Sequence, residues 1–126
     1  MTKTQKNIVV TGGAGFIGSN LINLLIEKTK FKIISIDNYS SGKKNNHIKN
    51  KRIKYIKGHT KNISQLIKNS AQVHTVFHFG EFARIYQSFL KMNECLESNS
   101  IGTNAVFNYC LKNKIKIIYS ATSATL

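Results

Sequence analysis

The chain has 126 residues and a formal net charge of +14, because 19 Lys and Arg residues stand against 5 Asp and Glu. A chain of this length forms one domain, expected over residues 1–126, that buries about two-thirds of its unfolded surface. An apolar run of about 18 residues, as a membrane-spanning helix needs, is absent. The N-terminus lacks a signal-peptide pattern, so we expect a cytoplasmic protein without a membrane partner.

The first predicted element is a strand over residues 7–11, which leads into three glycines spaced three apart. Gly12 can adopt the backbone angles of a tight turn, and Gly15 lets a ligand approach the backbone closely. Gly18 allows the following helix, expected over 15–29 from its apolar spacing, to pack on that strand. A strand, a glycine turn and a helix N-terminus in this order indicate a pyrophosphate site for a dinucleotide.

Asp37 ends the second predicted strand, residues 32–37. It follows the last glycine by about 20 residues, the usual offset of a ribose-binding carboxylate. A carboxylate accepts hydrogen bonds from ribose hydroxyl groups and repels a 2′-phosphate, so NAD is favoured over NADP. The alternative is a solvated turn residue, since Asp followed by Asn38 also favours turns.

The remaining elements alternate between strands and helices. They are a polar loop (38–51), a strand (52–57), a short helix (61–69), an apolar strand (73–79), a helical stretch broken near Asn93 (84–113) and a strand (115–120). This alternation predicts an α/β protein with a doubly wound, Rossmann-type parallel sheet. We expect about five strands in the order 3-2-1-4-5, with the pattern ending after the fifth.

Basic residues dominate the middle of the chain, where no acid occurs between Asn38 and Gly80. A polyanion such as nucleic acid is one partner for a surface of this kind. Nucleic-acid sites usually interleave arginine and aromatic residues, which are sparse here, so a nucleic-acid-binding basic domain is a minor alternative. A basic rim that attracts an anionic sugar nucleotide explains the charge more simply. Cys95 and Cys110 lack metal-ligand spacing, so we expect reduced thiols and no metal site.

One helix face of the long helical stretch combines an amide with apolar residues. Helical spacing places Asn99 on the same stripe as Leu96, Thr103, Val106 and Cys110. A buried amide needs hydrogen-bond partners, whereas an asparagine at the edge of the stripe can reach solvent. Both interpretations remain open for Asn99.

Several short segments occur in the order found in a known family. They are residues 11–20 (TGGAGFIGSN), 37–42 (DNYSSG), 76–80 (VFHFG), Asn99 followed by Gly102-Thr103, and 119–124 (YSATSA). Through them the chain resembles the extended short-chain dehydrogenase/reductases, the NAD-dependent sugar-nucleotide epimerases and dehydratases of the UDP-glucose 4-epimerase type. The resemblance implies an NAD cofactor, a nucleotide-sugar substrate in the complete enzyme, and a homodimer as one possible assembly.

The resemblance also implies roles for individual residues. Thr122 matches the catalytic Ser/Thr of the family, and Ser123 is a second candidate for that hydroxyl. A strand-end hydroxyl that caps a turn is the alternative for Thr122. The cofactor contacts implied are those of Gly12, Gly15, Phe16, Ile17 and Gly18 to the pyrophosphate, Asp37 to the ribose, Asn38, Ser41 and Gly42 on the adenosine side, and Phe79, Gly80 and Asn99 along the cofactor.

Two positions depart from the family pattern. His59, followed by Thr60, stands where the family often has an acid that contacts the adenine amino group. A neutral imidazole can accept that hydrogen bond, whereas an imidazolium cannot, so cofactor affinity is expected to be weaker or pH-dependent. Glu81 and Arg84 replace small or neutral residues near the reactive end of the cofactor, as a surface pair or as a substrate-selecting pair.

The tyrosine and lysine on which the family's proton transfer depends are not recognisable in the sequence. The one Tyr-x-x-x-Lys match, Tyr39 with Lys43, lies in the loop after the second strand and is interpreted as coincidence. We therefore expect the NAD-binding portion of a sugar-nucleotide epimerase or dehydratase that is inactive by itself. The alternative is a non-catalytic dinucleotide-binding module, or a truncated gene product, that needs a partner.

Overall fold

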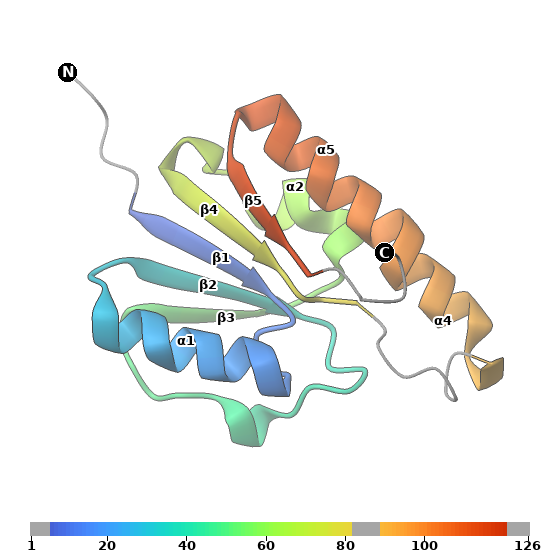
Figure 1. The fold of residues 1–126 in the computed structure, drawn as a ribbon, viewed down its shortest axis with the longest axis horizontal. Helices are drawn as coiled ribbons and strands as arrows, with labels where there is room; N and C mark the ends of the chain where they lie inside the picture. The colour runs from blue at the N-terminus through green and yellow to red at the C-terminus, as the bar shows by residue number, and fades with distance from the viewer. Residues whose placement is uncertain (1–5, 82–88, 121–126) are drawn as a thin grey trace.

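The fold is built on a parallel sheet of five strands in the order β3-β2-β1-β4-β5 (Figure 1). The computed structural model describes residues 6–81 and 89–120. The strands are β1 (Asn7–Thr11), β2 (Lys32–Asp37), β3 (Ile53–Lys57), β4 (Val73–His78) and β5 (Lys116–Tyr119). The expected α/β class, strand order and parallel pairing are confirmed, because every pair of neighbours runs in the same direction.

Helices cover both faces of the sheet, which gives three layers (Figure 1). Helix α1 (Phe16–Lys28), expected over 15–29, lies on one face of the sheet and buries Gly18, Ile22 and Leu25. Helices α2 (Ile63–Leu66) and α5 (Thr103–Asn113) pack on the other. Helix α4 (Met92–Leu96) precedes α5 along the chain and is joined to it by a helical turn.

Two apolar clusters fill the spaces between the layers. Alternation along β1 sends Ile8 and Val10 toward α1, where Ile22 and Ile33 complete that cluster. Val9 points to the opposite face and joins the cluster under α2 and α5, which includes Val76 and Val106. Every residue of β1 after Asn7 is buried, as expected for the central strand of a sheet covered on both faces.

The long helical stretch differs from the sequence prediction in its interior. Residues 89–90 are helical, and Lys91 leaves the helical region with φ −127° and ψ 52°, close to the break expected near Asn93. Between α4 and α5 the residues Glu97–Gly102 form a π-helical turn. A π-helical turn contains more residues than an α-helical turn, so it shifts the face on which all preceding residues lie. The first part of the predicted stretch, residues 84–88, lies outside the described residues.

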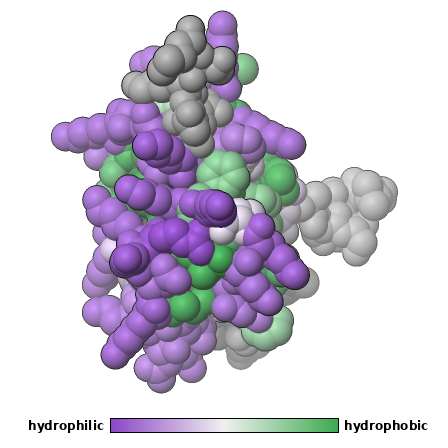
Figure 2. Space-filling model, turned by 90° about the vertical axis from the view of Figure 1, so that its left-hand side faces the viewer, coloured by the Kyte–Doolittle hydropathy of each residue, from purple (hydrophilic) through white to green (hydrophobic). Residues whose placement is uncertain are grey.

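The amino ends of the strands form a hydrophilic face (Figure 2). Lys6, Lys32 and Lys116 stand at or next to the amino ends of β1, β2 and β5 and are all exposed. Ligands of doubly wound folds bind at the opposite, carboxyl ends of the strands. Within residues 6–81 and 89–120, no helix is long and apolar enough to cross a membrane.

Candidate cofactor site

The turn after β1 is built around two glycines whose hydrogen atoms face backbone. Gly12 has φ +73°, and a Cβ there would lie 2.8 Å from the carbonyl oxygen of Phe79. A Cβ on Gly18 would lie 2.1 Å from the carbonyl oxygen of Gly12, in the first turn of α1. Only glycine therefore permits the chain to turn back so closely on itself at these positions.

Gly15 is less crowded than Gly12 and Gly18. It caps α1 without any side-chain hydrogen bond, so a ligand can reach the first-turn N–H groups of Phe16, Ile17 and Gly18. The only close neighbour of a Cβ on Gly15 would be the Gly12 carbonyl oxygen, at 3.3 Å. This end of α1 is thus an uncapped helix N-terminus of the kind that binds phosphate groups.

Position 13 also requires glycine, although Gly13 is not one of the three glycines spaced three apart. A Cβ at Gly13 would lie 2.0 Å from Oγ of Ser35 on β2 and 2.9 Å from Cδ1 of Ile22 on α1. At this residue the turn therefore packs closely against both β2 and α1. Sequence periodicity cannot show this, because the crowding depends on residues distant in the chain.

Asp37 lies at the carboxyl end of β2 with its side chain nearly buried. Its Oδ2 accepts the N–H of Ala14 at 2.9 Å, and its Oδ1 accepts the N–H of Tyr39 at 2.8 Å. Each carboxylate oxygen keeps a further lone pair for a ligand hydroxyl group. Gly42 stands behind the carboxylate, where a Cβ would come within 2.7 Å of Oδ2.

The loop after β2 is fastened to the glycine turn. Lys43 N–H and Asn46 Nδ2 both donate to the carbonyl oxygen of Ala14, at 3.0 and 2.8 Å. Tyr39 Oη lies 2.8 Å from Nε2 of His47. Burial and the nearby Asp37 raise the pKa of Tyr39, which is the opposite of what a proton-accepting tyrosine needs. These contacts support the interpretation of the Tyr39 and Lys43 match as coincidence.

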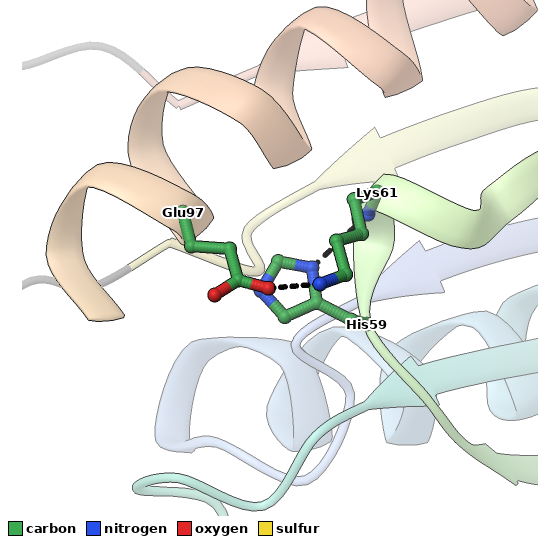
Figure 3. Close-up of polar contacts among 3 residues, drawn as sticks. All are labelled: His59, Lys61 and Glu97. Atoms are coloured by element: carbon green, nitrogen blue, oxygen red, sulfur yellow. Dashed lines mark hydrogen bonds and ion pairs between the residues drawn. The ribbon is translucent and has the colours of Figure 1, made fainter. Parts of the chain in front are cut away.

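His59 follows β3 and lies beside an ion pair (Figure 3). Its Nδ1 accepts the N–H of Lys61 at 3.1 Å and so caps a short helical turn. The Lys61 ammonium pairs with the Glu97 carboxylate of the π-helical turn. Burial lowers the pKa of His59 and outweighs the nearby Glu97, so the imidazole is neutral at pH 7 and carries its proton on Nε2. In this tautomer Nε2 is a donor, whereas the expected contact with the adenine amino group needs an acceptor.

Thr60 places a buried hydroxyl beside His59. Its Oγ1 has no hydrogen-bond partner among the described residues, and only 6% of the residue is exposed. A Cβ on Gly102 of the π-helical turn would lie 2.3 Å from this oxygen. A buried hydroxyl without a partner at the edge of a crevice fits a contact with a bound ligand.

Thr11, His78, Thr103 and Glu81 form a chain of hydrogen bonds in which each side chain donates to the next. Thr103 donates to Oε2 of Glu81 at 2.7 Å, so its hydroxyl can only accept from Nε2 of His78, at 2.9 Å. Nδ1 of His78 therefore accepts the hydroxyl of Thr11, at 2.7 Å. Burial lowers the pKa of His78 to about 4, which keeps the ring neutral and this pattern intact at pH 7.

The same chain fixes the backbone after β4. Thr11 Oγ1 accepts the N–H groups of Phe79 and Gly80, at 3.0 and 2.9 Å. At its other end, Tyr119 of β5 donates a second hydrogen bond to Oε2 of Glu81, at 3.1 Å. The ends of β1, β4 and β5 and the start of α5 are thus joined around one buried histidine.

These elements enclose a crevice at the carboxyl ends of the strands. Nine of the residues predicted from the sequence line it, and they are Gly12, Gly15, Asp37, Asn38, Ser41, His59, Thr60, Phe79 and Gly80. Ile36, Ser40, Gly58, Glu81 and Ser98 line it as well. A second cavity shares part of this wall and adds Lys91, Glu94 and Glu97.

Five predicted residues are not on the lining. The side chains of Phe16 and Ile17 are exposed at the start of α1, while Gly18 and Gly42 pack behind the crevice wall. Asn99 is exposed, with Nδ2 3.6 Å from Sγ of Cys95, and its neighbour Ser98 faces the crevice instead. Thr122, Ser123 and Arg84 lie outside the described residues.

The helical stripe predicted through Asn99 is wrong in its first half. Thr103, Val106 and Cys110 are buried as expected, but Leu96 is 55% exposed and Asn99 faces solvent. The π-helical turn changes which residues face the sheet, so Ser98 and Gly102 are buried in place of Leu96 and Asn99. Ser98 could not be found from the sequence, since a uniform helical period places it elsewhere.

The fold and this crevice define a Rossmann-type nucleotide-cofactor domain, with a helix N-terminus and a carboxylate at the ends of adjacent strands. A model of the NAD dependent epimerase/dehydratase family matches residues 8–126. The chain belongs to this family, as its sequence motifs indicated. The cofactor expected from the sequence, NAD, is the cofactor of the family.

Individual relatives support the same assignment. The chain is 34% identical to a UDP-N-acetyl-alpha-D-glucosaminuronate decarboxylase of Bacillus cytotoxicus, over 94% of this chain and 37% of the relative. It is similar in structure to UDP-glucose 4-epimerase of Thermotoga maritima, solved with UDP-glucose (TM-score 0.77, 32% identity, 92% of this chain and 38% of that one). The Bordetella bronchiseptica enzyme WbmF in complex with NAD+ superposes with TM-score 0.85 at 25% identity, over 94% and 37%. The chain thus spans little more than a third of the length of these relatives.

Proposed function

We propose that residues 1–126 are the NAD-binding portion of a sugar-nucleotide epimerase or dehydratase. The observation that carries the proposal is the crevice in which the uncapped N-terminus of α1 and the Asp37 carboxylate meet. The N–H groups after Gly15 would bind the pyrophosphate, and Asp37 would bind the adenosine ribose. The place of Gly15 on the crevice lining and the Thr60 hydroxyl, which has no hydrogen-bond partner among the described residues, fit a bound nucleotide.

When bound, NAD supplies a hydride acceptor and donor for a sugar carbon. The residues of this chain would bind and orient it, while Thr122, matched to the family's catalytic hydroxyl, and Ser123 as second candidate would act on the substrate. The nucleotide-sugar substrate of the complete enzyme and its assembly as a homodimer remain predictions. A non-catalytic binding module that needs a partner stays the alternative.

A pair of glycine variants tests the cofactor site. In Gly15→Ala the new methyl group meets only one atom, at 3.3 Å, on a residue that lines the crevice, so the fold should survive while NAD binding weakens about tenfold or more. In Gly18→Ala the methyl group collides with backbone, which should lower the free energy of unfolding by about 3 kcal/mol. Calorimetric NAD titration and thermal unfolding measure the two effects separately.

The matched control is Asn23→Ala, on the exposed side of α1, which should change neither quantity. Unchanged NAD affinity in a folded Gly15→Ala protein would remove the pyrophosphate from this turn. Absence of NAD binding by the unmodified chain would contradict the cofactor assignment altogether.

Catalysis by the isolated chain is not expected. Its one Tyr-x-x-x-Lys match is Tyr39 with Lys43, and the raised pKa of Tyr39 makes it a poor proton acceptor. We therefore expect the purified 126-residue chain to bind NAD without converting UDP-glucose to UDP-galactose, as followed by chromatography of the two sugars. Measurable turnover would show that the chain holds a complete catalytic apparatus.

A further inference from the structure

Glu81 lines the crevice with its carboxylate held in place by two hydroxyl groups. Its Oε2 accepts hydroxyl groups from Thr103 on α5 and Tyr119 on β5, at 2.7 and 3.1 Å. Within residues 6–81 and 89–120, no Lys, Arg or His side chain forms an ion pair with it. The histidine behind Thr103 is neutral, so the donors orient the carboxylate without cancelling its charge.

The position of Glu81 in the sheet defines which half of a dinucleotide it would face. Asp37 follows β2, on one side of the central strand β1, whereas Glu81 follows β4, on the other side. Both line the same crevice, with the glycine turn after β1 between them. If the adenosine ribose binds at Asp37, as proposed above, the nicotinamide half extends toward β4 and Glu81.

The two redox forms of the cofactor differ in charge at that half alone. The nicotinamide ring is a cation in NAD+ and neutral in NADH, while the ADP half is identical. A fixed carboxylate attracts the cation and leaves the neutral ring nearly unaffected, and it does so through space without requiring direct contact. We propose that Glu81 makes this crevice selective for NAD+ over NADH. The proposal rests on the proposed NAD-binding function.

The distribution of acids in the chain is consistent with a dedicated role. Only five acidic residues occur among 126, and Asp37 and Glu81 both line the crevice. Glu27 instead lies exposed on α1. Glu81 is held by three other elements of the fold: Thr103 of α5, Tyr119 of β5 and, through His78, Thr11 of β1. Such support keeps a charge at a defined distance from a ligand.

The test is titration of the full chain with NAD+ and with NADH, for the unmodified protein and for Glu81→Gln. Glutamine retains an oxygen that can accept from Thr103 and Tyr119 but removes the charge. We expect the ratio of the NADH to the NAD+ dissociation constant to fall by about three- to tenfold, mostly through weaker NAD+ binding. Glu81→Asp keeps the charge and should retain most of the ratio.

Glu27→Gln is the matched control, because it makes the same change in net charge on α1 and should leave the ratio unchanged. Thermal unfolding identifies the folded variants, and Glu81→Ala replaces Glu81→Gln if the latter does not fold. An unchanged ratio in either folded variant, with both cofactors still bound, overturns the role of Glu81. If the unmodified chain binds neither cofactor, the NAD-binding function itself is wrong.

Discussion

The ring of His78 is fully buried between two threonine hydroxyl groups, and this burial lowers its pKa to about 4. In the sequence it is one residue of the apolar strand predicted over 73–79, and no local feature marks it out. Its importance follows from Thr11 and Thr103, which lie 67 and 25 residues away along the chain. No local pattern connects three such positions, so only the fold reveals the network.

His78 predicts that the protein is acid-sensitive. The unfolded imidazole takes up its proton near pH 6.5, but the folded ring only near pH 4, so between these values the unfolded state binds more protons. The free energy of unfolding should therefore be highest above pH 7 and should decrease by about 2 kcal/mol between pH 7 and 5 from this group alone. Denaturant unfolding at a series of pH values measures this.

The variant His78→Asn separates this contribution from other groups. It should be less stable at pH 7, because the two threonines lose a shared partner, yet its stability should depend less on pH over the same range. His59, whose pKa is also lowered, remains in the variant and accounts for part of the residual slope. An equally steep profile in the variant would assign the acid sensitivity elsewhere.

At the scale of elements, the sequence was reliable wherever a pattern is local. The strand–glycine–helix unit and the acid at the end of β2 depend on neighbouring residues or short spacings, and the five-strand order followed from the alternation of strands and helices along the chain. The π-helical turn is different, because one extra residue per turn leaves no trace in the composition of Glu97–Gly102. Because of this extra residue in the turn, Ser98 and not Asn99 lines the crevice.

Gly102 shows how closely the π-helical turn fits the crevice wall. In Gly102→Ala the methyl group would lie 2.3 Å from Oγ1 of Thr60 and 3.3 Å from Cε1 of His59. Because both neighbours are packed, we expect the free energy of unfolding to fall by about 1–3 kcal/mol, with weaker NAD binding as Thr60 is displaced. Thermal unfolding and calorimetry measure the two effects.

Asn104→Ala, on the exposed side of α5 two residues later, serves as the control and should behave like the unmodified protein. If Gly102→Ala is as stable as the control and binds NAD equally well, the turn is free to move away from β3. The contact between the π-helical turn and Thr60 would then have no energetic consequence.

At the scale of the whole molecule, a high positive charge coexists with exposed apolar residues at one sheet edge. β5 pairs only with β4 among the described residues, and Ile118 and Tyr119 on it are 39% and 41% exposed. On α5, Leu111 is 80% exposed. An edge strand beside apolar surface favours association, whereas a net charge of +14 opposes it.

These opposing terms predict that salt controls association of the isolated chain. At low ionic strength the charge should keep it monomeric, while at about 1 M salt the screening length falls to about 3 Å and association should increase. Sedimentation or light scattering across a salt series measures this. Leu111→Lys should weaken the association, with Lys112→Ala beside it as a control; a monomer at all salt concentrations would contradict the prediction.

The histidine network also bears on the entropy of ligand binding. Thr11 accepts the N–H groups of Phe79 and Gly80, and Asp37 accepts two backbone N–H groups, so contacts within the chain hold these segments. A nucleotide that enters this crevice does not have to order these segments, so its binding avoids the conformational entropy loss that a flexible loop would impose. The glycine turn and the buried histidine thus fix the backbone of the candidate site within a chain that spans little more than a third of the length of its relatives.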